Sequence, residues 1–326
     1  MTGLRPWRAS SRTADGPHRA TPADIPALNT AFSEAFTERY RKDGLVGVRV
    51  PALNPLIWRY ALADAGDGAV LWRGDRGEVV AFNVAHHSGD EGWMGPLAVA
   101  PAYQGRGLGK AVVGAGVEWL RARGARTIGL ETMPRTMDNI GFYSSLGFVP
   151  GRLTLTVTLD AAPAARPSAL LGRLPHGARE SAAAACAALT ATVAPGRDFA
   201  REMALTEEYA VGDTVLAYEP GGALAGFALC HSAPLVEGRV REEVRVLKLV
   251  VASPDALPAL AEAVCDFARR SGARRAAFRV QGEYVWLYRA LLAQGARVRW
   301  SDLRMTLDGF PEPAAAAGAV LSNWEI

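Results

Sequence analysis

Three closely spaced glycines that follow a glutamine carry the strongest chemical signal in this chain of 326 residues. Gln104, Gly105, Gly107 and Gly109 come after an apolar run and before an amphipathic stretch, so they predict a turn between a buried strand and a helix. Glycines let the backbone approach a ligand closely, and the first N–H groups of a helix attract negative charge. The turn therefore predicts a site for a phosphate group.

Two common phosphate-binding patterns do not fit this turn. A P-loop requires Ser or Thr after its lysine, whereas Lys110 is followed by Ala111. A dinucleotide fingerprint requires GxGxxG, whereas the spacing here is GxGxG. The pattern that does fit is Q-x-x-G-x-G, and the alternative is a glycine-rich turn without a ligand.

A second pattern follows downstream. Residues 127–132 read as a strand, and Asn139 and Tyr143 fall on a short helix that ends at Gly147 before Phe148 opens another strand. The segment thus has the form N-x-x-x-Y-x-x-x-G-F.

Together the two patterns closely resemble the coenzyme A site of the GNAT superfamily of N-acetyltransferases. The resemblance is strong over residues 19–160 and weak over 213–308. It implies an α/β (α+β) chain of two tandem GNAT folds, each with a mixed, mostly antiparallel sheet flanked by helices. It also implies acetyl-CoA as co-substrate, bound through the pantetheine arm and the pyrophosphate by Leu97, Ala98, Val99, Gln104, Gly105, Arg106, Gly107, Leu108, Gly109, Lys110, Asn139 and Tyr143.

Acetyl transfer to an amine requires a deprotonated amine and a protonated or stabilised thiolate. The resemblance makes Tyr143 the candidate general acid, because a phenol with a pKa of about 10 keeps its proton at neutral pH. A packed aromatic residue is the alternative reading. Glu131, at the end of the strand beside the cofactor strand, is the best-placed carboxylate for a general base, although the free amine and water also suffice without one.

Other titratable residues cluster near the same cleft. His86 and His87 end a predicted strand, and Asp90 and Glu91 lie on the next turn. A metal site would need a third ligand at useful spacing, and the reaction needs no metal, so we predict none. His86 has a counterpart in His231, in the half that lacks the phosphate turn, which favours a structural role.

The composition of the chain limits the classes of partner and the cellular compartment that we expect. Lys and Arg number 36 against 33 Asp and Glu, a net charge of +3 that predicts neither a nucleic-acid nor a membrane partner. The basic residues 1–18 lack the apolar segment of a signal peptide, and no run of 18 apolar residues occurs. Cys186, Cys230 and Cys265 have no paired spacing, so we expect reduced, buried thiols in a cytoplasmic protein.

The first half reads as a helix, a hairpin and a cofactor strand. Thr21 and Pro22 form a helix start, and apolar residues then recur every three or four positions. Strands follow at 69–72, 79–86 and 93–100, joined by turns rich in glycine and aspartate. Residues 41–58 have no clean period, and the resemblance places the acceptor site there.

A faint internal duplication appears in the second half. Residues 81–86, 124–126 and 158–160 match 226–231, 272–274 and 306–308. The counterpart of the phosphate turn, residues 251–258, contains two prolines and no glycine, and Leu291 stands where Tyr143 would be. We therefore expect a second half without catalysis that covers a sheet edge and walls the acceptor cleft, or else offers a second, non-CoA pocket.

These observations predict an acetyl-CoA-dependent N-acetyltransferase that acetylates a primary amine of a small molecule by direct attack in a ternary complex. The alternative is an acyl-CoA-binding sensor or regulatory protein without turnover. The two halves would form a pseudo-dimer within one chain, compatible with a monomer. The expected boundaries are a flexible arm (1–18), a catalytic domain (19–160), a linker (161–175), a degenerate GNAT-like domain (176–310) and a tail (311–326).

Overall fold

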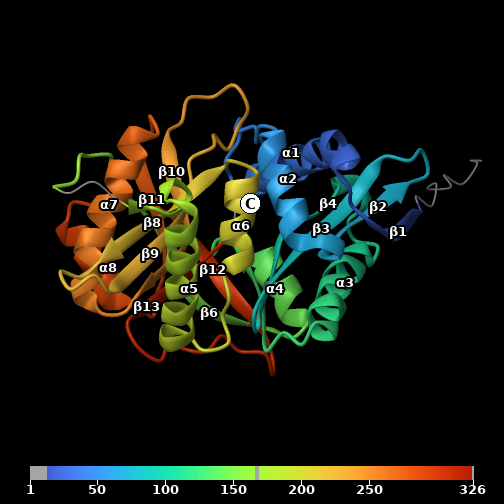
Figure 1. Ribbon diagram of the computed structural model, residues 1–326. Helices are drawn as coiled ribbons and strands as arrows, with labels where there is room; N and C mark the ends of the chain where they lie inside the picture. Colours follow the sequence, from blue (N-terminus) through green and yellow to red (C-terminus); the bar gives the residue numbers. More distant parts are fainter. Residues whose placement is uncertain (1–12, 166–168, 325–326) are drawn as a thin grey trace, which may run out of the picture.

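A mixed sheet of thirteen strands runs through the molecule, with helices on both faces (Figure 1). The computed structural model describes residues 13–165 and 169–324. The N-terminal half contains β1 (Ala14–Arg19), α1 (Ile25–Lys42), α2 (Pro55–Ala65), β2 (Ala69–Gly74), β3 (Val79–Ser88), β4 (Glu91–Val99), α3 (Leu108–Ala122), β5 (Thr127–Thr132), α4 (Met137–Ser145) and β6 (Phe148–Asp160). The C-terminal half contains β7 (Ala169–Leu170), α5 (His176–Val193), α6 (Ala200–Glu208), β8 (Gly212–Tyr218), β9 (Leu224–His231), β10 (Glu243–Val251), α7 (Leu257–Arg270), β11 (Arg275–Gln281), α8 (Val285–Ala293), β12 (Arg297–Leu307) and β13 (Ala319–Ser322).

The two halves repeat the same order of elements, from β1 to β6 and from β7 to β12. Matching glycines, Gly124 and Gly272, follow α3 and α7 with left-handed φ angles of 80° and 75°, a conformation that favours glycine. Pairing is antiparallel except between β4 and β5 and between β10 and β11. The predicted fold class, two tandem folds with mostly antiparallel sheets flanked by helices, is confirmed.

The halves exchange their last long strands. The sheet order is β1-β2-β3-β4-β5-β12-β6-β11-β10-β9-β8-β7, so β12 of the second half inserts beside β5 and β6 of the first half lies beside β11. Arg304 opposes Glu131 and Arg279 opposes Thr156, and the same offset of 148 (279 − 131, 304 − 156) relates the two pairs. The duplication is therefore also a pseudo-symmetric exchange that fuses both sheets into one (Figure 1).

Helices cover the first half of the sheet in two layers. On one face Phe82 packs in a core cluster with Leu28 of α1 and Trp58 of α2. On the other face Ala85 packs with residues of α3 and α4 such as Val113 and Tyr143. Alternation along β3 produces this division, since successive side chains of a strand point to opposite faces. The part of the sheet that contains β4 and β5 therefore has helices on both of its faces.

The helical start predicted at Thr21 is present. The Thr21 N–H donates to the Asp24 carboxylate at 2.9 Å, and a short 3-10 turn, Pro22–Asp24, leads into α1. The start of α2 has a side-chain cap, since the Asn54 side chain accepts from the Leu56 N–H at 3.0 Å.

The structure differs from the expected boundaries at three places. Residues 14–19, predicted mostly as a flexible arm, pair with β2 as an edge strand, while residues 1–12 lie outside the described part. The predicted linker 161–175 contains β7, which pairs with β8; its residues 166–168 are not described. The predicted tail 311–326 contains β13, which pairs with β10. Backbone pairing, which short irregular sequences do not reveal, orders all three segments.

Two expectations about the chain as a whole can be compared with the structure. Across residues 13–165 and 169–324, no helix combines the length and the apolar character needed to span a bilayer. All three cysteines are buried with free thiols, and burial raises the pKa of Cys186 and of Cys265 to about 12. Such thiols do not form the thiolate that a nucleophile requires.

A buried polar cluster joins the halves beneath α6. Lys248 of β10 is 1% exposed, lies 3.7 Å from the Glu202 carboxylate and donates to the Ser322 hydroxyl at 2.9 Å. Ser88 of β3 donates to Glu202 from the first half. Burial, with a contribution from the Asp64 carboxylate, raises the pKa of Glu202 to about 7 even though Lys248 opposes the shift.

This shift makes stability depend on pH. Between pH 4.5 and about 7 the native state holds a proton on Glu202 that the unfolded chain has lost, so the free energy of unfolding falls as the pH rises through this range. We expect Glu202→Gln to reduce the stability lost between pH 5 and pH 8 by up to about 3 kcal/mol. Urea unfolding at the two pH values measures the effect. Glu208→Gln, at an exposed position of the same helix, should keep the wild-type slope, and an equal slope in Glu202→Gln would contradict the assignment.

Candidate cofactor and acceptor site

A fork between two parallel strands forms the centre of the site. Pairing of β4 with β5 runs from Glu91 opposite Thr127 to Met94 opposite Leu130 and then stops. Beyond Met94, β4 continues along β3 to Val99, and no strand among residues 13–165 and 169–324 pairs with its other edge there. The fork therefore leaves one edge of β4 open for a ligand.

Of the predicted residues, Leu97 and Val99 turn their backbone groups to this open edge, whereas those of Ala98 face β3, contrary to the expectation that all three contact the arm. The N–H of Ala100 donates to the Val80 carbonyl of β3 at 2.8 Å. Because the backbone groups of successive residues point to opposite sides of a strand, those of Leu97 and Val99 point into the fork. They are placed to pair with an extended ligand lying along β4.

The glycine turn closes the fork at its outer end. Gln104 donates from its side chain to the Val99 carbonyl at 2.9 Å, which ties the turn to the strand. Gly105 and Gly107 have left-handed φ angles of 73° and 84°, and Gly107 is the N-cap of α3. Gly109 has another reason to be glycine, since a Cβ there would lie 3.2 Å from the ring of Phe142 on α4.

The amides at the start of α3 make the turn a candidate anion site. The first N–H groups of an α-helix lack intrahelical partners and carry partial positive charge. The predicted pyrophosphate residues that follow Gln104 fall in this exposed turn and first helical residues: Gly105, Arg106, Gly107, Leu108, Gly109 and Lys110.

Helix α4 brings the second predicted pattern to the same fork. Asn139 donates from its side chain to the Thr132 hydroxyl at the end of β5, at 3.3 Å. Tyr143 is 7% exposed, with its ring centroid 5.3 Å from Phe142 and 6.2 Å from Phe148. Burial raises the pKa of Tyr143 to about 12, so its phenol keeps its proton at neutral pH.

The C-terminal end of α1 bridges the mouth of the fork. Lys42 reaches the Gln104 side chain at 3.4 Å, and the Thr136 hydroxyl at the start of α4 donates to Asp43 at 2.6 Å. Asp43 is held in turn by Arg39 at 2.5 Å. These contacts lie in and beside residues 41–58, the segment in which the sequence shows no clean period.

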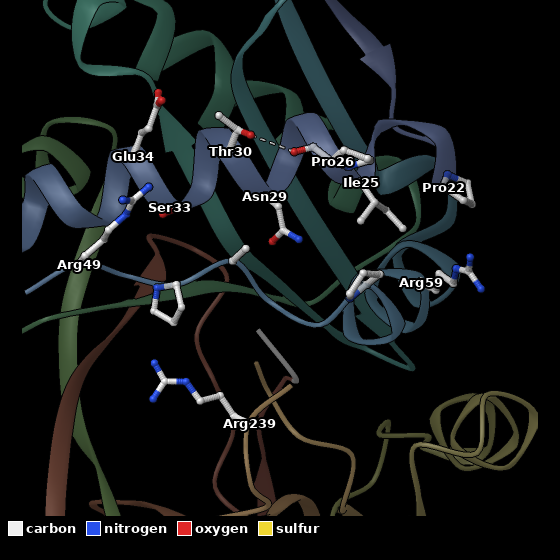
Figure 2. Close-up of a pocket in the computed structure, with 13 residues that line it drawn as sticks. Pro22, Ile25, Pro26, Asn29, Thr30, Ser33, Glu34, Arg49, Arg59 and Arg239 are labelled. Atoms are coloured by element: carbon white, nitrogen blue, oxygen red, sulfur yellow. Dashed lines mark hydrogen bonds between the residues drawn. The ribbon is translucent and has the colours of Figure 1, made fainter. Parts of the chain in front are cut away.

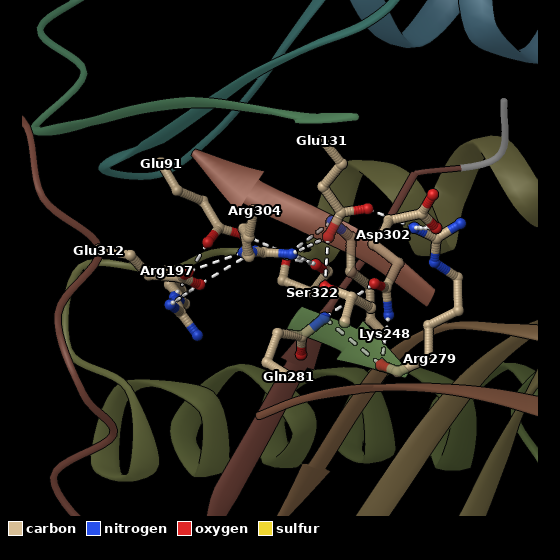
Figure 3. A network of polar contacts seen from close by, with 12 residues as sticks. Glu91, Glu131, Arg197, Lys248, Arg279, Gln281, Asp302, Arg304, Glu312 and Ser322 are labelled. Carbon is tan, nitrogen blue, oxygen red and sulfur yellow. Dashed lines mark hydrogen bonds and ion pairs between the residues drawn. The ribbon is translucent and has the colours of Figure 1, made fainter. Parts of the chain in front are cut away.

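Glu131, predicted as the general base, lies in a dense ion-pair network (Figure 3). Its carboxylate accepts from Arg304 at 2.9 Å, from the Thr154 hydroxyl at 2.5 Å and from Arg279. Burial opposes the charge, but Arg279 and Arg304 outweigh it and lower the pKa of Glu131. A carboxylate held by two guanidinium groups is a weak base, and its environment therefore argues against the predicted role.

His86 and Glu91, two other titratable residues near the fork, have structural partners. His86 is 2% exposed, with Nδ1 2.5 Å from Asp64 and Nε2 3.1 Å from the Gly95 carbonyl. Glu91 is buried 3.0 Å from Arg197, and burial is outweighed by that charge, so its pKa is lowered. Burial lowers the pKa of His87. Within the described residues no group of three or more His, Cys, Asp or Glu side chains could hold a metal ion.

The corresponding fork of the second half is filled. Pairing of β10 with β11 ends at Val246 opposite Phe278, the same place in the repeat, but β13 then pairs along β10 from Lys248 opposite Ser322 to Val251 opposite Ala319. The chain's own C-terminal segment thus occupies the edge that is open in the first half. Leu291, the counterpart of Tyr143, is fully buried.

A separate groove of about 860 Å³ lies between α1, the segment before α2 and the connection from β9 to β10 (Figure 2). Arg49, Arg59 and Arg239 line it against the single carboxylate of Glu34. Its lining includes neither Tyr143 nor the fork edge of β4, so this groove is distinct from the fork.

Comparison with known proteins matches part of the chain to one family. Residues 29–148 match the Acetyltransferase (GNAT) family. The chain is 36% identical over 72 residues to the ribosomal protein bS18-alanine N-acetyltransferase of Escherichia coli (strain K12); the match covers 22% of this chain and 49% of that protein, about half of its length.

Two solved structures are similar over nearly the whole chain and show the fold. One is a putative acetyltransferase from Pyrococcus horikoshii, with a TM-score of 0.65, 19% identity and 97% of both chains covered. The other is a tandem GNAT protein from the clavulanic acid biosynthesis pathway, with a TM-score of 0.60, 13% identity, and 93% of this chain and 100% of that chain covered.

Proposed function

We propose that this chain, whose residues 29–148 form a GNAT acetyltransferase domain, transfers the acetyl group of acetyl-CoA to a primary amine of a small molecule. The observation that carries the proposal is the open fork beyond Met94 and Leu130, with the glycine turn at its outer end and Tyr143 packed in one cluster with Met94 and Leu130. An extended thioester with a diphosphate fits such a site, because open strand amides and a helix N-terminus lie in line.

In this proposal the backbone of Leu97 and Val99 pairs with the pantetheine arm, and one of their amides polarises the acetyl carbonyl. The pyrophosphate is bound by the amides of residues 105–110, and Asn139 contacts the arm. The amine attacks the carbonyl carbon directly in the ternary complex, and Tyr143 gives its proton to the departing thiolate. The C-terminal half, with its filled fork, binds no second acetyl-CoA.

Two measurements test the proposal. Acetyl-CoA at saturating concentration should stabilise the chain by a few kcal/mol, roughly, as seen in a thermal shift. Release of free thiol on mixing with acetyl-CoA and a panel of amines should then identify acceptors. Binding without thiol release would favour the alternative of an acyl-CoA sensor, and no shift at all would overturn both functions.

Tyr143→Phe tests the acid. We expect turnover to fall by about 100-fold, since proton transfer by a positioned side chain contributes roughly 10²–10⁴. Acetyl-CoA affinity should change little, because the ring that packs against Phe142 and Phe148 is retained. Steady-state kinetics and calorimetry measure the two quantities. Tyr218→Phe, at an exposed position in the other half, is the control, and equal loss of turnover and affinity in Tyr143→Phe would exclude the acid role.

A further inference from the structure

Strand exchange places a carboxylate of the C-terminal half at the fork of the N-terminal half. On β12, Leu303 opposes Thr132 and Arg304 opposes Glu131 of β5. Residues opposed in an antiparallel pair share a face, and side chains alternate along a strand. Asp302, two residues before Arg304, therefore lies on the same face as Glu131 and just beyond Thr132 at the end of β5, where β4 has already diverged.

The Asp302 carboxylate is partly exposed and can accept further hydrogen bonds. Its side chain is 14% exposed, Oδ2 accepts from Arg279 at 3.1 Å and Oδ1 accepts from the Trp300 indole at 3.1 Å (Figure 3). A carboxylate can accept about four hydrogen bonds, so each oxygen retains capacity for another donor. Arg279 also binds Glu131, so its charge is shared between two carboxylates.

Charged and titratable groups from three other elements act on Asp302. Burial and the Glu131 carboxylate of β5 raise the pKa of Asp302, although Arg279 of β11 opposes them. Tyr40 of α1 lies within electrostatic range, since burial and then Asp302 raise the pKa of that phenol, with Arg135 opposing. Asp302 is thus a stronger base than an ordinary aspartate, in contrast to the neighbouring Glu131, whose pKa is lowered.

We propose that Asp302 binds the ammonium group of the acceptor at the mouth of the fork and removes its proton. The inference rests on the proposed acetyl transfer and assigns one of its catalytic residues to the C-terminal half. The end of α1 and the start of α4 meet at this mouth, β12 pairs with the end of β5 beside it, and Asp302 acts on Tyr40 of α1.

The proton balance is complete without a co-reactant. Asp302 takes one proton from the ammonium and passes it to water, and the free amine forms a C–N bond with the acetyl carbon. The C–S bond breaks, and the thiolate takes the Tyr143 proton. The second nitrogen proton, lost as the amide forms, restores Tyr143 through solvent. The products are the amide, free coenzyme A and one proton.

Asp302→Asn in the full-length chain tests the assignment. At pH 7 we expect kcat/KM for the best amine of the panel to fall by about 100-fold or more, with acetyl-CoA affinity unchanged. The loss should shrink as the pH approaches the amine's own pKa, because the free amine then needs no base. Asp302→Glu should restore part of the rate. A purely structural role would produce neither the recovery with pH nor the rescue.

Asp308→Asn is the matched control, since it makes the same change at an exposed position just after β12. If Asp302→Asn matches Asp308→Asn at every pH while the wild-type chain transfers acetyl groups, Asp302 is not the base and the proposed function stands. If the wild-type chain binds acetyl-CoA but acetylates no amine, the proposed function fails and this inference fails with it.

Discussion

Gly107→Val should weaken acetyl-CoA binding by about 100-fold or more. Gly107 has a φ of 84° at the start of α3, a conformation that costs a β-branched residue about 1–3 kcal/mol. Space is not the obstacle, since a Cβ there would meet nothing within 4 Å. Valine would instead turn the backbone toward negative φ and move the amides that are proposed to bind the pyrophosphate, and each lost hydrogen bond to a charged group costs about 1.5–3 kcal/mol.

Calorimetry with acetyl-CoA measures this loss, and circular dichroism checks that the variant is folded. Gly114→Ala is the control, because Gly114 lies inside the same helix with open space around it and no left-handed φ. The control should bind acetyl-CoA as the wild-type chain does. A folded Gly107→Val variant with wild-type affinity would refute the assignment of the turn.

The second large effect concerns β13. Removing residues 319–326 should lower the free energy of unfolding by an amount on the order of 5 kcal/mol, comparable with the stability of many domains. Ala319, Val320 and Leu321 are at most 1% exposed, and their removal uncovers the edge of β10. It also removes Asn323, which accepts from Gln281 at 2.9 Å and donates to the Arg279 carbonyl at 3.1 Å.

Because the truncated chain is expected to fold poorly, a point variant provides the quantitative test. Leu321→Ala should cost about 2–5 kcal/mol in urea unfolding. The same change at Leu153, which is 40% exposed, should cost under about 1 kcal/mol. Similar losses for both variants would show that β13 does not seal the second fork.

Local patterns predicted the elements that form the candidate cofactor site. The strand expected at 127–132 is β5, the glycine turn leads into α3, and Asn139 and Tyr143 lie on the short helix α4. Each of these has a signal within a few residues, such as a glycine stop or an apolar period. The family resemblance drawn from the same residues is confirmed by the match over residues 29–148.

Long-range pairing was beyond the reach of such patterns. The alternation in β12 does not say that it leaves its own half to pair with β5, and only that exchange brings Arg304 beside Glu131. The role predicted for Glu131 depended on the opposite assumption of a free carboxylate. No local pattern marks Asp302 either, because it lies far along the chain, in the half expected to lack catalysis.

The composition of the two short strands near the ends of the chain, β1 and β13, does not indicate a strand. β1 contains Gly16 and Pro17, which depress strand propensity but are tolerated at a sheet edge. β13 has four residues after an Ala- and Pro-rich stretch, too few to show a period. Neither segment has a sequence signal of its own, and each depends on a partner strand already in place.

The crossing of β6 and β12 between the halves also bears on how heat or mutation inactivates the protein. We expect that neither half unfolds alone, because each contributes a central strand to the hydrogen-bond ladder of the other half. A destabilising substitution in the core around α7 should therefore also lower the activity proposed for the N-terminal half, although it lies far from the fork. The C-terminal half, whose fork is filled by β13, thus supplies part of the scaffold that keeps the N-terminal half folded.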